Sequence, residues 1–116
     1  MIDVHTHLHP PRLFAAIRRW FAERSPWQLD HPTEPHDVAR IMREHGVEKF
    51  AFFSYAHKPG MARDLNAWLN DTARELGPGA VPLGTVHLDD PDPAGDMREA
   101  LRGGCAGLKL HENVQR

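Results

Sequence analysis

The sequence predicts an α/β fold built on parallel strands. Short apolar stretches alternate with longer segments in which apolar residues recur at every third or fourth position. The predicted order is strand, helix, helix, strand, helix, strand, helix, strand. Strands that alternate with helices favour parallel pairing with right-handed crossovers, because each crossover helix covers a face of the sheet. Apolar residues make up 41% of the chain and charged residues 26%, which is typical of a folded globular domain.

The first predicted strand covers residues 1–8, where apolar Ile2 and Val4 alternate with polar side chains. Two consecutive prolines end this strand, since proline cannot donate to a strand ladder and favours the first turn of a helix. The helix that follows is predicted over residues 12–23, from apolar residues at helical spacing: Leu13, Ile17, Trp20 and Phe21.

A second helix follows an irregular connector. It is predicted to begin at Thr33, whose hydroxyl is of the type that caps helices, and to end at Gly46, a residue type favoured just past a helix end. Residues 47–55 form the next predicted strand. Because residues 50–53 are continuously apolar (Phe-Ala-Phe-Phe), this strand is expected to be covered on both faces.

Two further pairs of helix and strand complete the pattern. Residues 61–76 are predicted as a helix and residues 80–88 as a strand. Asp92 followed by a proline is a typical N-cap and first helical position, so the last helix is predicted from there to Arg102. The fourth strand is predicted over residues 105–111.

The composition excludes several classes of partner. The net charge is -2, from 14 basic and 16 acidic side chains, so neither nucleic acid nor an anionic membrane is an expected partner. No apolar run approaches the roughly 18 residues of a membrane helix, and no signal peptide is expected. The single cysteine, Cys105, excludes an internal disulfide and fits a reducing, cytoplasmic compartment. It has no basic neighbour in sequence and is expected to be a small buried residue.

The sharpest chemical signal is the triplet His5-Thr6-His7. Residues two apart in a strand project to the same face, so both imidazoles are expected to point the same way. Neutral imidazole is a common ligand for zinc and related ions, and active sites of (β/α)₈ barrels lie at the C-terminal ends of the strands. We therefore predict that His5 and His7 bind a divalent metal ion, with zinc as the expected ion. His9 is expected either at the mouth of this site or in a loop.

Polar side chains also end the other predicted strands. His57 follows the second strand, His87 ends the third, and Lys109 and His111 end the fourth. His57 and His87 are candidate substrate contacts, with solvated loop residues as the competing interpretation. Lys109 and His111 are the candidate catalytic residues, because they share one face of a strand and alternate with apolar neighbours.

These motifs resemble those of a known family. Residues 2–7 (Ile-Asp-Val-His-Thr-His) are similar to the opening strand of the amidohydrolase superfamily. Residues 107–111 (Gly-Leu-Lys-Leu-His) resemble the fourth strand of its amidohydrolase-related group, which includes aminocarboxymuconate-semialdehyde decarboxylase. Residues 59–66 and 84–87 also resemble that group, so the resemblance covers essentially the whole chain.

The resemblance implies an α/β fold that is the N-terminal half of a (β/α)₈ TIM barrel, with about four parallel strands and flanking helices. Residues 1–116 would then be a single partial barrel domain, since a complete barrel needs about 250 residues. The resemblance makes His5 and His7 metal ligands. It makes Lys109 and His111 site residues of the fourth strand, where binuclear members carry a carboxylated lysine between two metals. The family's later ligands and its catalytic aspartate have no counterpart among the 116 residues.

The implied activity is metal-dependent hydrolysis of a small molecule with a carbonyl or carboxylate group. The ion would polarise the substrate and lower the pKa of bound water towards about 7. Non-oxidative decarboxylation by the same family is one alternative. A non-catalytic metal-binding half-barrel is the alternative from another class; it would form a homo-oligomer in which a second copy covers the sheet edges. Metallohydrolases of the polymerase-histidinol-phosphatase or TatD-like kind explain the first strand but the fourth less well. The substrate and the number of metal ions stay open.

Overall fold

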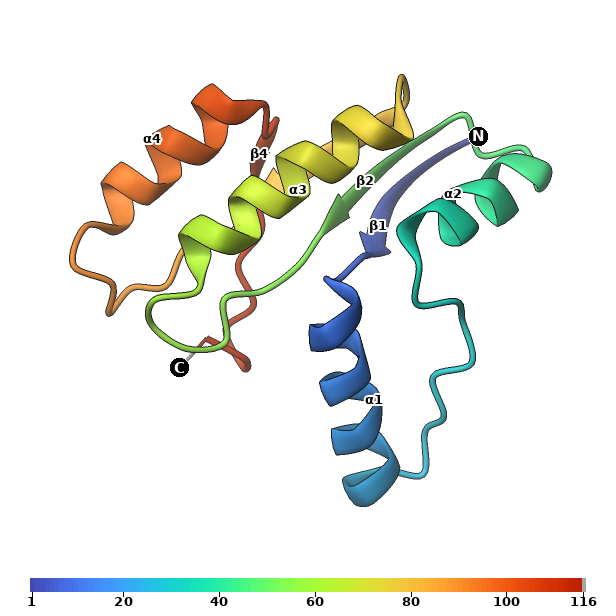
Figure 1. Cartoon of the computed structure of the whole chain (residues 1–116), viewed down its shortest axis with the longest axis horizontal. Coiled ribbons are helices and arrows are strands. Elements are labelled where there is room, and N and C mark those ends of the chain that lie inside the picture. The colour runs from blue at the N-terminus through green and yellow to red at the C-terminus, as the bar shows by residue number, and fades with distance from the viewer. Residues whose placement is uncertain (116) are drawn as a thin grey trace.

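The computed structural model describes residues 1–115 and confirms an α/β fold with one four-stranded sheet. All four strands are parallel, and their order in the sheet is their order in the chain, β1-β2-β3-β4 (Figure 1). The elements are β1 (Ile2–His7), α1 (Pro11–Arg24), α2 (Pro35–Glu44), β2 (Lys49–Phe53), α3 (Ala62–Leu76), β3 (Ala80–Gly84), α4 (Pro93–Gly103) and β4 (Gly107–Leu108).

The main core lies between the sheet and helices α2 and α3. Phe50 and Phe52 of β2 are fully buried there, against Ala39 of α2 and Leu69 of α3. Alternate residues of β2 therefore face the helices, while Phe53 faces the opposite side of the sheet. Helix α1 does not cover the sheet; it runs away from the C-terminal end of β1 (Figure 1). Its Leu13 packs on a smaller cluster near the start of α3.

Strand β1 contains a bulge between Asp3 and Thr6, in the stretch that includes His5. Asp3 pairs with Phe50 and Thr6 with Phe52, so three steps along β1 match two steps along β2. A bulge of this kind locally breaks the alternation of faces and re-aims side chains. After it, the Thr6 hydroxyl contacts the Met42 sulfur on the helix side, at 3.9 Å. His7 pairs with Phe53 and lies on the opposite face.

The strands are shorter than the apolar pattern predicts. β3 ends at Gly84 because the next backbone groups bond to a side chain: the Thr85 N–H donates to the Asn66 amide oxygen, and the Asn66 amide nitrogen donates to the Thr85 carbonyl, both at 2.8 Å. β4 has two residues, although the Lys109 N–H still donates to the Gly84 carbonyl. Beyond that, the chain turns, and the His111 N–H donates to the Gln115 side chain.

The two helix caps predicted from sequence have different outcomes. Asp92 caps α4 as predicted, and its carboxylate accepts the Gly95 N–H at 2.9 Å. The prediction that Thr33 caps α2 is wrong. Pro35 takes the first helical position, so the N-cap is Glu34, and its side chain makes no capping bond. In residues 1–115, no helix combines the length and apolar character needed to cross a bilayer.

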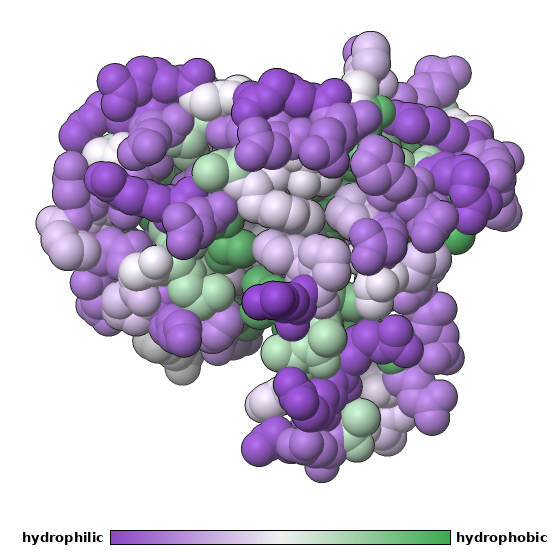
Figure 2. Space-filling view, viewed as in Figure 1, coloured by the Kyte–Doolittle hydropathy of each residue, from purple (hydrophilic) through white to green (hydrophobic). Residues whose placement is uncertain are grey.

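One face of the sheet is open. The surface on the helix side is mostly hydrophilic (Figure 2), whereas Ile2 and Val4 of edge strand β1 are 66% and 72% exposed. The accessible surface is 7256 Å², compared with about 6400 Å² expected for a compact monomer of this mass. All-parallel sheets are almost always covered on both faces. The excess of roughly 900 Å² is close to the ~800 Å² that each partner buries in a standard interface.

Gly79 provides a test of the packing between β2 and the turn that leads into β3. Its φ is +99°, and a Cβ there would collide with the backbone oxygen of Glu48. We expect Gly79→Ala to lower the free energy of unfolding by about 2–4 kcal/mol, from the left-handed conformation and the backbone clash together. Gly46→Ala is the matched control, because φ is +82° there and no atom lies within 4 Å. It should cost only about 1 kcal/mol. Urea denaturation measures both losses, and equal losses would contradict the role of the clash.

The open face leads us to expect self-association. Sedimentation velocity at increasing protein concentration should show dimers or larger species. Val4→Glu should shift the distribution towards monomer, because it places a charge on the exposed sheet edge. Trp27→Glu is the control, since Trp27 is 71% exposed but lies in the connector between α1 and α2. A single monomeric species at all concentrations would refute the expectation.

Candidate functional site

His5 and His7 converge at the C-terminal end of β1. Their Nε2 atoms lie 3.1 Å apart, and their ring centroids 5.1 Å apart. Both rings contact the Phe53 ring edge to face, each with centroids 4.9 Å apart. The two imidazoles therefore share a face, as their spacing predicts, and Phe53 supports both of them.

The residues predicted at the end of the fourth strand reach the same cluster. The Lys109 ammonium lies 5.4 Å from the centre of the Phe53 ring, within the range of a cation–π contact. The His111 ring packs edge to face on Tyr55, with centroids 5.0 Å apart. The Tyr55 hydroxyl in turn lies 3.4 Å from His7 Nε2. Both predicted residues thus lie beside the histidine pair, although they follow the short strand β4 instead of lying in it.

His57 and His87 follow the second and third strands. His87 is buried, and its Nδ1 accepts the Asp89 N–H at 3.2 Å. His57 is exposed, and its pKa is lowered by partial burial and then by the charges of Lys58 and His87. Within residues 1–115, no hydrogen bond or ring contact links either of them to His5 or His7. The structure does not bring these two histidines into the main cluster.

Two further residues belong to the cluster: His9, which the sequence left between the site mouth and a loop, and Tyr55, which it did not single out. His9 is buried against α1, with its ring 6.0 Å from that of His7 and nearly parallel to Phe14. Tyr55 contacts both His7 and His111. The signal for His9 was present in the sequence, since it extends the two-residue spacing of His5 and His7. Tyr55 offered none, because its position depends on how the chain leaves β2.

Burial and neighbouring positive charges favour the neutral form of the His7 and His9 imidazoles. The pKa of His7 is lowered to about 4, first by burial and then by the positive charges of basic neighbours: His5, His111, Lys109 and His31. Burial lowers the pKa of His9 to about 4 as well, with smaller contributions from His7 and His31. His31 lies in the connector between α1 and α2, and no sequence pattern predicts that it approaches this cluster. Neutral imidazole is the form that binds metal ions.

The donor set is small. In the part of the chain that the structure describes, no group of three or more His, Cys, Asp or Glu side chains is arranged to hold a metal ion. The converging atoms are those of His5 and His7. Tyr55, Lys109 and His111 surround them with a hydroxyl, a cationic amine and a second acid–base group. This arrangement offers two ligands together with groups that can bind anions and transfer protons.

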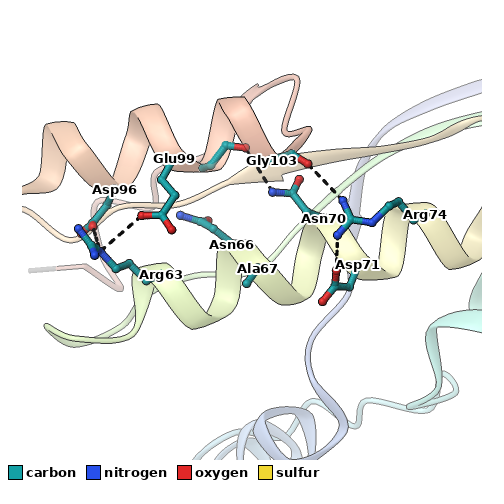
Figure 3. A pocket seen from close by; sticks show the side chains of 10 residues that line it. Arg63, Asn66, Ala67, Asn70, Asp71, Arg74, Asp96, Glu99 and Gly103 are labelled. Atoms are coloured by element: carbon teal, nitrogen blue, oxygen red, sulfur yellow. Dashed lines mark hydrogen bonds and ion pairs between the residues drawn. The ribbon is translucent and has the colours of Figure 1, made fainter.

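A groove between α3 and α4 is unrelated to the histidines (Figure 3). Arg63 crosses it to Asp96 and Glu99. At its other end Arg74 pairs with Asp71 and reaches the backbone of α4. Both arginines are paired with carboxylates, so the groove serves as a polar seam between two helices. It contains none of the predicted site residues.

Comparisons with protein-family models, with curated proteins and with solved structures found no match in any of the three. The function proposed for the chain therefore depends on its own motifs and on their geometry.

Cys105 lies outside the site and is buried, as expected from the sequence. Its thiol is 3.3 Å from the Asn70 amide oxygen, and burial raises the pKa to about 11. Only the thiolate reacts with iodoacetamide, so at pH 8 we expect alkylation to be roughly 100-fold slower than in the urea-unfolded chain. An exposed reference thiol, Ala94→Cys on α4, should react at the ordinary rate. Equal rates for the two thiols in the folded chain would contradict this prediction; mass spectrometry of each peptide separates them.

Proposed function

We propose that the chain is the N-terminal half of a (β/α)₈ barrel of the amidohydrolase-related kind, and that it serves metal-dependent hydrolysis of a small molecule. The observation that carries the proposal is the 3.1 Å approach of the His5 and His7 Nε2 atoms at the C-terminal end of the first strand. Four parallel strands in sequential order, with three of the intervening helices packed together on one side, agree with half of such a barrel.

The pair fits a divalent ion such as zinc. Two imidazole nitrogens that share a tetrahedral zinc ion lie about 3.3 Å apart, given Zn–N distances near 2.0–2.1 Å. The observed separation of 3.1 Å is close to this value, and the lowered pKa keeps His7 in its neutral, ligating form. A catalytic zinc site usually has three protein ligands, so His5 and His7 would supply part of the set.

When bound, such an ion supplies Lewis acidity for polarising a carbonyl and for activating water. The chain's own residues then hold and orient the substrate. Lys109 lies beside the pair and takes part in no ion pair within residues 1–115, so it is free to bind a carboxylate of the substrate. His111 and the Tyr55 hydroxyl lie together on the side of His7, where each can accept or donate a proton.

Two alternatives are supported by particular observations. The cationic surroundings of His7 favour a substrate with a carboxylate, which is consistent with non-oxidative decarboxylation at the same site. The open sheet face and the two-ligand donor set favour a non-catalytic metal-binding half-barrel that pairs with a second copy. Release of carbon dioxide would identify the first alternative. Tight zinc binding by a dimer without any turnover would identify the second, because two copies together offer two histidine pairs.

The proposal predicts weak zinc binding that depends on the histidine pair. In isothermal titration calorimetry, the chain of 116 residues should bind zinc with two protein ligands and therefore weakly. His5→Ala and His7→Ala should each weaken binding by at least about 10-fold, because each removes one of two ligands. His36→Ala is the control, since His36 is exposed on α2 and faces Glu75. The chain by itself should show no hydrolase turnover.

Two results would refute this picture. Zinc affinity that is unchanged in both His5→Ala and His7→Ala would show that the metal binds elsewhere. Tight stoichiometric binding accompanied by catalysis in the parent chain would show that the ligand set within these 116 residues is complete.

A further inference from the structure

His9 is held in one orientation beside the metal-binding pair. Its Nδ1 lies 2.8 Å from the Ser54 hydroxyl, at the end of β2, and its ring lies nearly parallel to Phe14 of α1, with an angle of 12° between the planes. Only 7% of the residue is exposed. The strand end and the helix thus fix the ring from two directions.

The Ser54 hydroxyl determines which ring nitrogen of His9 carries hydrogen. Ser54 is fully buried, and within residues 1–115 its hydroxyl has no hydrogen-bond partner other than His9 Nδ1. If Nδ1 carried the hydrogen of a neutral imidazole, the Ser54 O–H would be a buried donor without an acceptor, which is strongly disfavoured. The Ser54 hydroxyl therefore donates to Nδ1, and Nε2 carries the hydrogen. A charged imidazole would also carry a hydrogen at Nε2.

This Nε2–H retains contact with solvent. Among residues 1–115, every fully buried side-chain nitrogen or oxygen has a hydrogen-bond partner, whereas His9 Nε2 makes no hydrogen bond. Nε2 must therefore reach solvent. The rings nearest to His9 besides Phe14 are His7 and Tyr55, with centroids at 6.0 and 6.3 Å. The ring that carries the free donor thus lies beside His7 of the histidine pair.

We propose that His9 is a ligand-binding residue whose Nε2–H donates a hydrogen bond to an anionic oxygen of a molecule bound at the His5–His7 metal pair. This inference rests on the proposed function. The neighbouring polar groups agree with such a ligand, because Lys109 offers a cation and Tyr55 a hydroxyl. A molecule with carboxylate or hydroxamate oxygens would supply hydrogen-bond acceptors for these three donors.

The first test determines the position of the hydrogen and needs no metal. In the chain labelled with ¹⁵N-histidine, long-range ¹H–¹⁵N correlation spectra distinguish the two neutral tautomers. His9 should carry its hydrogen on Nε2. Ser54→Ala removes the hydroxyl that donates to Nδ1, so His9 should then populate both neutral tautomers. A hydrogen on Nδ1 in the parent chain would overturn the inference.

The second test measures ligand binding, with acetohydroxamate as the probe on the zinc-loaded chain. His9→Asn keeps an acceptor for Ser54 but removes the donor at the Nε2 position, and should weaken acetohydroxamate binding roughly 10-fold. His9→Gln places an amide donor near the Nε2 position and should restore much of the affinity. His36→Asn is the control on an exposed helix surface. Zinc affinity should stay unchanged in all three variants, and dispersed NMR spectra should confirm that they fold.

The outcomes separate the inference from the proposed function. Zinc binding with unchanged acetohydroxamate affinity in His9→Asn would overturn the role of His9 and leave the proposed function standing. A parent chain that takes up no zinc would refute the proposed function, and with it the ligand assigned to His9. In that case an Nε2–H tautomer would still support the donor state of His9.

Discussion

The candidate site depends on the ring of Phe53. This side chain is the last residue of β2 and is almost fully buried, although it faces away from the helices. His5, His7 and Lys109 all contact it, from β1 on one side and from the end of β4 on the other. A smaller residue at this position would remove the surface on which the imidazoles and the amine converge. Strand β2 therefore supports both faces of the sheet. Phe53 supports the candidate site, and Phe50 and Phe52 pack against α2 and α3 on the other face.

Buried polar contacts hold the ends of the strands where the sheet stops. Asn66 of α3 exchanges two hydrogen bonds with the backbone of Thr85, in place of a neighbouring strand. Just beyond the end of β2, the Ser54 hydroxyl bonds to the His9 side chain. Each contact satisfies groups that would otherwise be buried without a partner, which explains why polar residues occur in a largely apolar region. The polar contacts that end the strands also fix the residues around the site.

The order of strands and helices followed from periodicity, and so did the common face of His5 and His7. The bulge in β1 could not be predicted, because it exists only relative to the register of β2. The same holds for Tyr55 and His31, since the paths of a strand exit and a connector bring them to the cluster. Periodicity predicts which residues belong to the same helix or strand. The candidate site, however, is formed largely by residues that follow the ends of strands, and periodicity does not predict their positions.

The charges around the pair set a condition on any ligand. The groups that lower the pKa of His7 are all basic, and no carboxylate is among them. A divalent ion adds further positive charge, which repels protons and other cations from the imidazoles and attracts oxygen anions. In the proposed site, an oxygen anion from a substrate or from another segment of protein would balance this charge. The open face of the sheet and the two converging imidazoles thus support the same proposal, a partner on the side opposite the helices.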